Sequence, residues 1–401
     1  MHGIIKFVDP QTRRWGFIIP DDNGPDVHFS ISNFSGPHPT PSDSGAEVEF
    51  EIVEDAQGRH AKSARFLAPQ APSAPAQSGE APSDMLKQWA FIPYFQFRGR
   101  DGKDYSSVLH LLSSLALDER WFFGKEPNPQ NPYPVLDNYL KYTFLKAQRE
   151  EKVNYQGPYA TFNTGLVDKL YDPIFALFEK NPQKGFQPWA FNDFCVPGKG
   201  GSGKKLTSVF YPLPDSPTYF TNNFDMLLDT TKGIHVDYEH VIFDGIERDR
   251  FPSDFLRQHV PRGVTWQEVS SLGYQERREF LAGFVKALGE DVQCLRGIKG
   301  RLEDAKLLAE KRTRWNFKTA IPQYYPRLDH MSLLLPLSLM DDRVVDIALV
   351  VTRNPSGSYQ GRTVLPLAWA YKNARLVCRP DSDWLEPQVI SDGGDQSEAE
   401  D

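Results

Sequence analysis

The chain has 401 residues, of which 40% are hydrophobic and 24% are charged, and its formal net charge is −8 at pH 7. This balance is typical of a folded globular protein, and the length favours two domains. The acidic charge excludes a protein that binds duplex DNA through an overall positive field, so a nucleic-acid contact must be a local patch. The apolar run 333–340 is too short to cross a bilayer, so no membrane partner is expected.

Short runs of β-forming residues follow one another at the start of the chain, separated by turn residues. They cover 4–8, 15–19, 27–30, 48–53 and 60–67. Such short, closely spaced strands predict a small closed barrel. The fold class that we expect for the chain is therefore multidomain: an all-β, five-stranded barrel of the OB type, followed by a larger α+β domain.

The second of these strands places two aromatic rings on one face, because Trp15 and Phe17 are two residues apart. Exposed rings beside cations suit single-stranded nucleic acid, because bases stack on the rings and cations follow the phosphates. The alternative, that the rings are core, is less favoured, because Ile5, Val8 and Ile18 already supply a core face. The expected binding face consists of Lys6, Phe7, Trp15, Phe17, His28 and Phe29.

The same segment resembles the cold-shock domain over its whole length. The resemblance rests on the motifs at 3–7, 14–18, 26–30 and 45–53, which occur in the family's order and spacing. It implies that the six residues above form the nucleic-acid-binding face. Three positions depart from the family pattern: Phe7 stands where Trp is usual, Arg14 where glycine is usual, and Asp26 where a stacking aromatic is common. These departures predict weaker binding than that of a typical member.

Two segments lack the apolar side chains that a core requires. Residues 68–84 are rich in Ala, Pro and Ser, which predicts a flexible linker. The last residues, 391–401, carry five acids and no base, which predicts a solvated tail. The expected domains are a barrel at 1–68, a linker at 69–84, an α+β domain at 85–388 and an acidic disordered tail at 389–401.

Helical periodicity in the large domain covers 106–116, 136–150, 274–288 and 291–312, and strands are expected at 331–339, 344–351 and 363–367. Their topology is left open. The domain resembles an uncharacterised family of bacteria and fungi that is commonly joined to RNA-binding modules, which implies only involvement with RNA. The resemblance is carried by the motifs at 162–166, 219–223, 239–242, 250–252, 333–337, 346–350, 359–363 and 370–376.

The densest polar cluster lies at 234–244. If this segment is a strand, His235, Asp237 and Glu239 share one face and could bind Mg²⁺ or Mn²⁺, which would activate water against a phosphate. The alternative is a solvent-exposed strand face with His240 in the core. Arg250 could hold a phosphate, but together with Arg248 it could equally pair with neighbouring acids on a surface turn.

Three asparagines, Asn163, Asn222 and Asn223, suit either turns and helix caps or contacts to a nucleotide. Residues 198–204 satisfy the front of a phosphate-binding P-loop, but Lys205 stands where a hydroxyl should bind magnesium. The flanking residues also predict neither the strand nor the helix that a P-loop needs. We therefore expect a flexible basic loop that offers Lys199, Lys204 and Lys205 to RNA phosphates.

The sequence thus predicts a protein whose barrel captures single-stranded RNA, with single-stranded DNA as the alternative, and presents it to a domain that recognises RNA or a nucleotide. The competing hypothesis makes the large domain an RNA-processing hydrolase that acts on RNA phosphates or a 5′-end nucleotide. Its candidate catalytic or ligand residues are His235, Asp237, Glu239, His240 and Arg250. Cys195, Cys294 and Cys378 are too widely spaced for a metal knuckle and are expected to be reduced core residues. The N-terminus has no secretory signal pattern, so a cytoplasmic location is expected.

Overall fold

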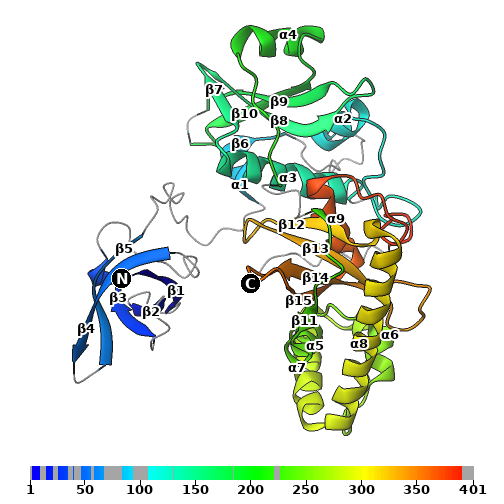
Figure 1. Ribbon diagram of the computed structural model, residues 1–401. Helices are drawn as coiled ribbons and strands as arrows, with labels where there is room; N and C mark the ends of the chain where they lie inside the picture. The colour runs from blue at the N-terminus through cyan, green and yellow to red at the C-terminus, as the bar shows by residue number, and fades with distance from the viewer. Residues whose placement is uncertain are drawn as a thin grey trace. The chain divides into compact units, whose positions relative to one another are not determined.

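The computed structural model describes residues 2–9, 15–20, 26–34, 39, 47–55, 58–66, 84–93, 107–129, 131–183, 185–220 and 226–390. The chain divides into two compact units, Met1–Glu80 and Ala81–Asp401 (Figure 1). Almost all of the predicted linker and tail lies outside the described residues.

The first unit is a closed five-stranded barrel with the strand order β1-β2-β3-β5-β4. Its core takes alternate residues of each strand, such as Ile18 on β2 and Val27 and Phe29 on β3, all fully buried. The predicted barrel is confirmed. Its strands are β1 (His2–Val8), β2 (Trp15–Pro20), β3 (Val27–Ser30), β4 (Glu47–Asp55) and β5 (Gly58–Phe66).

The barrel needs a glycine at position 16. A Cβ atom there would lie 2.3 Å from the carbonyl oxygen of Phe7 on β1 and 2.6 Å from the Phe29 ring. The absence of a side chain at Gly16 therefore lets β1, β2 and the buried ring approach closely.

The second unit contains two five-stranded sheets. The first has the order β6-β10-β9-β8-β7, and both of its faces are covered. On β9, Ile174, Ala176 and Phe178 face the main core, whereas Phe175 and Leu177 pack against helix α4 (Gly200–Val209). The strands are β6 (Ala90–Phe91), β7 (Val153–Gln156), β8 (Tyr159–Val167), β9 (Pro173–Lys180) and β10 (Trp189–Cys195).

The second sheet has the order β11-β15-β14-β13-β12, with β11 parallel to β15. It too is buried on both faces: Ala348 and Val350 on β14 face the main core, and Ile347, Leu349 and Val351 face a second core. The strands are β11 (Ile234–Val236), β12 (Ile321–Tyr325), β13 (His330–Leu337), β14 (Ile347–Arg353) and β15 (Tyr359–Pro366).

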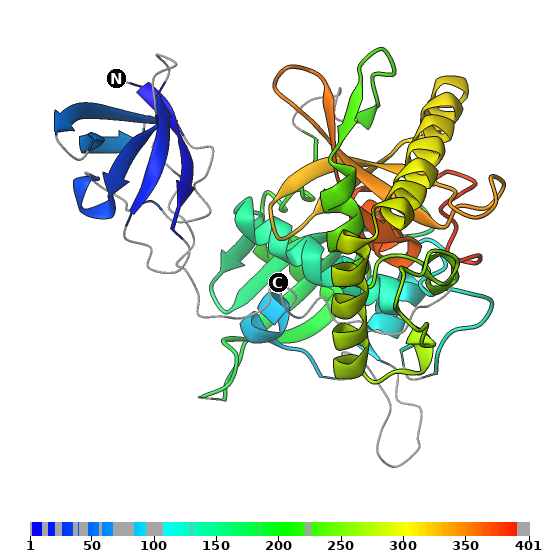
Figure 2. The same cartoon turned by 90° about the horizontal axis from the view of Figure 1, so that it is seen from below.

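The helices fall into groups by the core that they line (Figures 1 and 2). The main core, which the two sheets share, includes residues from α1 (Met85–Trp89), α2 (Val108–Leu115), α3 (Pro134–Arg149) and α9 (Leu367–Val377). The second core includes residues from α5 (Tyr238–Glu247), α6 (Ser253–Gln258), α7 (Tyr274–Glu290) and α8 (Val292–Trp315). The predicted α+β class is confirmed. No helix in the described part of the chain has both the length and the apolarity needed to cross a membrane.

A buried ion pair lies in the main core. Arg375 on α9 donates two hydrogen bonds to the carboxylate of Glu119, at 2.5 and 2.7 Å, and the side chains are 8% and 7% exposed. The guanidinium also lies over the rings of Trp121 and Tyr139, 4.9 and 4.6 Å from their centroids. The charge of Arg375 is thus fully compensated inside the protein.

Candidate nucleic-acid interface

A row of aromatic rings crosses four strands of the barrel. Phe7 on β1 is the register partner of Phe17 on β2, Phe17 is the partner of His28 on β3, and His28 is the partner of His60 on β5. The centroids of successive rings are 5.8, 5.5 and 5.6 Å apart. We call these four residues the aromatic row. All four are half-buried, so their rings remain accessible from the outside.

Trp15 extends the aromatic row along β2. Its indole lies 5.6 Å from the Phe7 ring and 6.0 Å from the rings of Phe17 and His28, and it is stacked with the imidazole of His28. Trp15 is 36% exposed. An exposed indole packed against three other rings offers a surface on which a base can stack.

The imidazole of His28 is biased towards its neutral form. Its burial lowers the pKa, and the neighbouring His60 lowers it further. At neutral pH, His28 therefore presents an uncharged aromatic ring, which can stack like its neighbours.

The cation predicted beside the rings is engaged by an acid. Lys6 donates a hydrogen bond of 2.6 Å to the carboxylate of Asp26, and the two side chains are 52% and 36% exposed. Asp26 occupies the position at which the cold-shock pattern often has an aromatic residue. The substitution thus places a carboxylate where it reduces the positive field of Lys6.

The structure corrects the predicted face at one residue and adds another. Phe29 was expected beside His28 on the open face, but it is fully buried in the barrel core. Adjacent residues in a strand point to opposite faces, so both rings cannot face outwards. His60 was not predicted, because its place in the aromatic row depends on the parallel pairing of β3 with β5, which sequence spacing does not reveal.

The candidate metal site in the large domain is not formed. The strand β11 ends at Val236, and α5 begins at Tyr238, so Asp237 is a helix cap whose carboxylate accepts a hydrogen bond from the His240 N–H at 3.1 Å. The expectation of a strand that places His235, Asp237 and Glu239 on one face is therefore wrong. Among the described residues, no group of three or more His, Cys, Asp or Glu could hold a metal ion. His240 is exposed, so the alternative of a core histidine is also wrong.

The two arginines that follow are bound within the protein. Arg250 donates hydrogen bonds to Asp244 at 3.2 Å and to the hydroxyl of Thr363 at 2.6 Å, and Arg248 donates to the other oxygen of Asp244 at 2.6 Å. Arg250 is only 13% exposed, and its burial lowers its pKa. Its guanidinium thus joins α5 to β15, and little of its surface is accessible to a phosphate.

Of the three candidate asparagines, Asn163 lies within the described residues. Asn163 lies at an irregularity of β8, where its side-chain oxygen accepts a hydrogen bond from the Gly165 N–H at 2.9 Å. This local bond agrees with the turn interpretation of Asn163. Asn222 and Asn223 lie outside the described residues.

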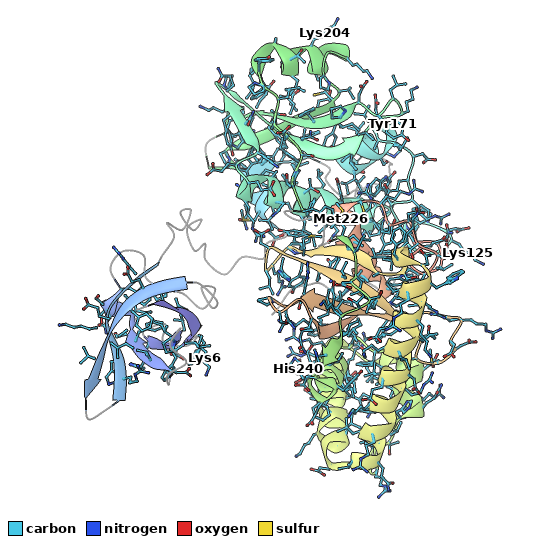
Figure 3. All side chains as sticks on the ribbon, in the orientation of Figure 1. Lys6, Lys125, Tyr171, Lys204, Met226 and His240 are labelled. Atoms are coloured by element: carbon cyan, nitrogen blue, oxygen red, sulfur yellow. The ribbon has the colours of Figure 1, made fainter. Side chains whose placement is uncertain are left out.

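The expected flexible basic loop is a strand end followed by a helix, so this prediction is wrong. β10 ends at Cys195 and α4 begins at Gly200. The helix could not be predicted, because residues 198–203 contain four glycines, which hide any helical periodicity. Lys199 pairs with Asp168 and Asp172 at 2.8 and 2.7 Å, and Lys205 pairs with Glu179 at 3.0 Å. Lys204 is exposed on α4, far from His240 on α5 (Figure 3). The predicted residues of the large domain therefore do not form a single site.

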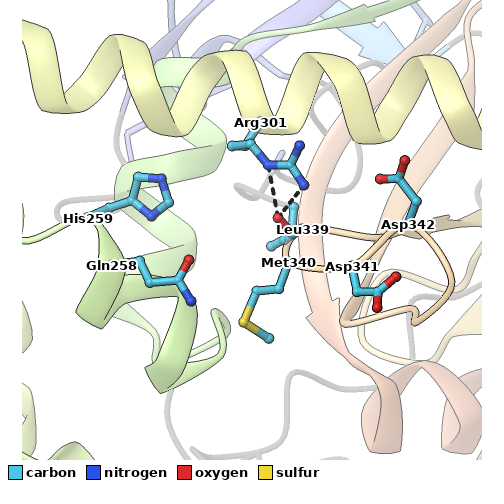
Figure 4. A pocket seen from close by; sticks show the side chains of 7 residues that line it. All are labelled: Gln258, His259, Arg301, Leu339, Met340, Asp341 and Asp342. Atoms are coloured by element: carbon cyan, nitrogen blue, oxygen red, sulfur yellow. Dashed lines mark hydrogen bonds between the residues drawn. The ribbon is translucent and has the colours of Figure 1, made fainter.

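A surface pocket of the large domain lies between α6, α8 and the segment after β13 (Figure 4). Its Arg301 donates two hydrogen bonds, of 3.0 and 2.6 Å, to the carbonyl of Leu339, and Nδ1 of His259 bonds to the carbonyl of Phe255 at 2.8 Å. The Arg301 bonds thus join α8 to the segment after β13. The pocket is lined by Gln258, His259, Arg301, Leu339, Met340, Asp341 and Asp342, and it contains none of the predicted site residues.

The closed barrel with aromatic rings exposed across its strands defines a nucleic-acid-binding module. Residues 1–65 match the model of the 'Cold-shock' DNA-binding domain, so the N-terminal unit is a cold-shock domain, and its class binds nucleic acid. Residues 112–384 match the family described as Domain of unknown function (DUF3825), and the chain belongs to this family. A comparison with curated proteins finds no match.

Proposed function

We propose that this protein binds single-stranded RNA, which enters along the aromatic row of the barrel and is passed to the large domain for recognition. The observation that carries the proposal is the in-register row of Phe7, Phe17, His28 and His60 with the exposed Trp15 beside it. Stacked rings on an open strand surface receive unpaired bases, each worth about 1–3 kcal/mol. Paired bases inside a duplex cannot reach them.

The proposal extends to the large domain as a binding domain without a catalytic step. Two observations support this view. The candidate carboxylates Asp237 and Glu239 lie at the start of α5 and not on a common strand face, and Arg250 is bound to Asp244 and Thr363. Two of the residues on which hydrolysis was predicted to depend, Asp237 and Arg250, thus have structural partners instead.

The experiment is a titration of fluorescently labelled single-stranded RNA with the full-length protein, followed by fluorescence anisotropy. The variant Trp15→Ala/His28→Ala removes two rings that face outwards. We expect it to lose at least about 2 kcal/mol of binding free energy, on the order of a 30-fold rise in Kd. An RNA duplex of the same sequence is expected to bind the wild-type protein at least about tenfold more weakly than the single strand.

The matched control is Ser63→Ala, which changes an exposed residue of β5 outside the aromatic row. Its affinity is expected to equal that of the wild type. Single-stranded DNA of the same sequence, titrated in parallel, tests the choice of RNA. If the double variant is folded and binds single-stranded RNA as tightly as the wild type, the proposal is wrong.

A further inference from the structure

We propose that the large domain carries a second single-stranded nucleic-acid contact at the C-terminal end of α8, formed by Lys311, Arg314, Trp315 and Phe317. We call these four residues the α8 patch. The identity of its ligand rests on the proposed function, because the ligand is the strand that the barrel binds. The segment 311–318 reads KRTRWNFK and contains four cations and two aromatic residues among eight.

The aromatic side chains of the α8 patch face solvent. Trp315, the last residue of α8, is 90% exposed, and Phe317, which begins the following 3₁₀ turn (Phe317–Thr319), is 61% exposed. Large aromatic side chains are usually buried, because burial of their apolar surface stabilises the fold, and rings this exposed do without that stabilisation. Their exposure is therefore explained best by a ligand that covers them.

Cations surround the exposed indole. Lys311 lies one helical turn before Trp315, and Arg314 is three residues from Lys311, so the three side chains share one surface of α8. Both cations are exposed, and neither forms an ion pair with any residue that the structure describes. In a chain with a net charge of −8, this is a local positive field of the kind that phosphates require.

The backbone beneath the patch is held firmly. Arg312 donates hydrogen bonds to the hydroxyl of Ser338, at 3.2 Å, and to the carbonyl of Asp342. Thr313 is buried, and its hydroxyl bonds to the carbonyl of Ala309 at 2.9 Å. The indole N–H of Trp384 binds the carbonyl of Thr319 at 2.9 Å just beyond the patch. The rings are thus presented on a fixed support, which lowers the entropy lost on binding.

Charge favours a nucleic acid over an apolar protein surface as the partner. The rings of Trp315 and Phe317 are separated by a polar residue and follow Lys311 and Arg314, which form no ion pair within the described part of the chain. Sites for apolar partners are instead continuous apolar patches. Lys318, which follows Phe317, pairs with Asp381 at 2.5 Å, and both side chains are more than half exposed. Such an exposed pair gives way readily to a phosphate. Because the barrel and the α8 patch belong to one chain, a strand held by one is at a high local concentration for the other.

The test compares two lengths of single-stranded RNA on the full-length protein, an oligouridylate of about 6 nucleotides, which fills the barrel alone, and one of about 30, which can reach both surfaces. For Trp315→Ala/Phe317→Ala we expect about tenfold weaker binding of the long strand and unchanged binding of the short one. The midpoint of thermal unfolding should stay the same, because both rings are exposed.

A second variant, Lys311→Gln/Arg314→Gln, tests the cations. The slope of log Kd against log salt for the long strand should fall by about 1.4, at about 0.7 for each neutralised phosphate of a single strand. The matched control is Tyr211→Ala, which removes a ring that is 98% exposed in a segment, 206–216, without a cation. Its binding of both strands should be unchanged.

Unchanged long-strand binding in both double variants overturns the α8 patch, and so does an effect that Tyr211→Ala shares. If the variants bind the long strand normally and instead lose a protein partner, the patch binds protein and the proposal is wrong. The two proposals fail separately. If the short strand does not bind the wild type, the barrel proposal is wrong, whereas the long strand's dependence on Trp315 can still be measured.

Discussion

At the scale of the residue, we expect Asp26 to limit the affinity of the barrel for RNA. Its carboxylate pairs at 2.6 Å with Lys6, the cation that the proposal assigns to phosphates. We expect Asp26→Asn to tighten RNA binding about fivefold, roughly 1 kcal/mol for one charge removed near a phosphate, and the gain should shrink at high salt. The control is Glu49→Gln, which breaks a comparable exposed pair with Arg65 at 2.6 Å. A weaker complex of the Asp26 variant would show that Asp26 instead positions Lys6 for binding.

We expect His28 to make both the stability of the barrel and its binding of RNA depend on pH. Its folded pKa lies below the ordinary value of 6.5, because burial and His60 disfavour the charged form. The barrel is therefore most stable above pH 6.5 and loses this contribution as the pH falls through the pKa of folded His28. A bound phosphate raises that pKa, so RNA binding should take up a proton and tighten on acidification. Titrations between pH 7.5 and 5.5 check this, and His28→Gln should flatten the profile.

Single residues could be placed from the sequence where a local rule sufficed. Alternation along β2 correctly put Trp15 and Phe17 on one face. The same rule separates Phe29 from His28, because the two residues are adjacent in β3 and point to opposite faces. The position of His60 could not be predicted from the sequence, because its pairing with His28 on a parallel strand depends on how the barrel closes.

At the scale of the element, the start of α5 decides the role of Asp237. Its carboxylate caps the helix by accepting a hydrogen bond from the His240 N–H. We expect Asp237→Ala to lower the free energy of unfolding by about 1 kcal/mol, and Asp237→Asn to lower it far less, because asparagine caps nearly as well. Urea unfolding measures both. If Asn is as harmful as Ala, the charge of Asp237 matters beyond the cap.

Sequence patterns placed several helices and the three antiparallel strands at the centre of the second sheet. α3, α7 and α8 lie close to the expected ranges, and so do β13, β14 and β15. The sheet of β7 to β10 was missed, because a run such as 173–178, buried on both faces, shows no alternation, and periodicity alone cannot tell such a strand from a buried helix. α4 was missed for a different reason: its glycines predict a loop, whereas Gly203 lies so close to the Val196 carbonyl that a Cβ atom would stand 2.0 Å from it.

At the scale of the whole molecule, the two compact units predict two separate unfolding transitions. Gly16→Ala should destabilise the barrel by about 1–3 kcal/mol through overpacking against Phe7 and Phe29. Glu119→Gln should destabilise the large domain by about 3–5 kcal/mol by leaving Arg375 buried without its partner. Differential scanning calorimetry of the full chain should show each variant shifting one transition only. A shift of both by either variant would mean that the units unfold together.

The spacing of the rings in the aromatic row determines how far apart the bases of a bound strand must lie. Its rings follow one another at 5.5–5.8 Å across the strands, whereas bases stacked on one another in a helix are about 3.4 Å apart. A strand that places successive bases on successive rings must first pull those bases apart. Tracts whose bases stack weakly on one another, such as runs of uridine, lose the least stacking free energy when the bases separate. The barrel should therefore select for flexible RNA and not for particular base identities.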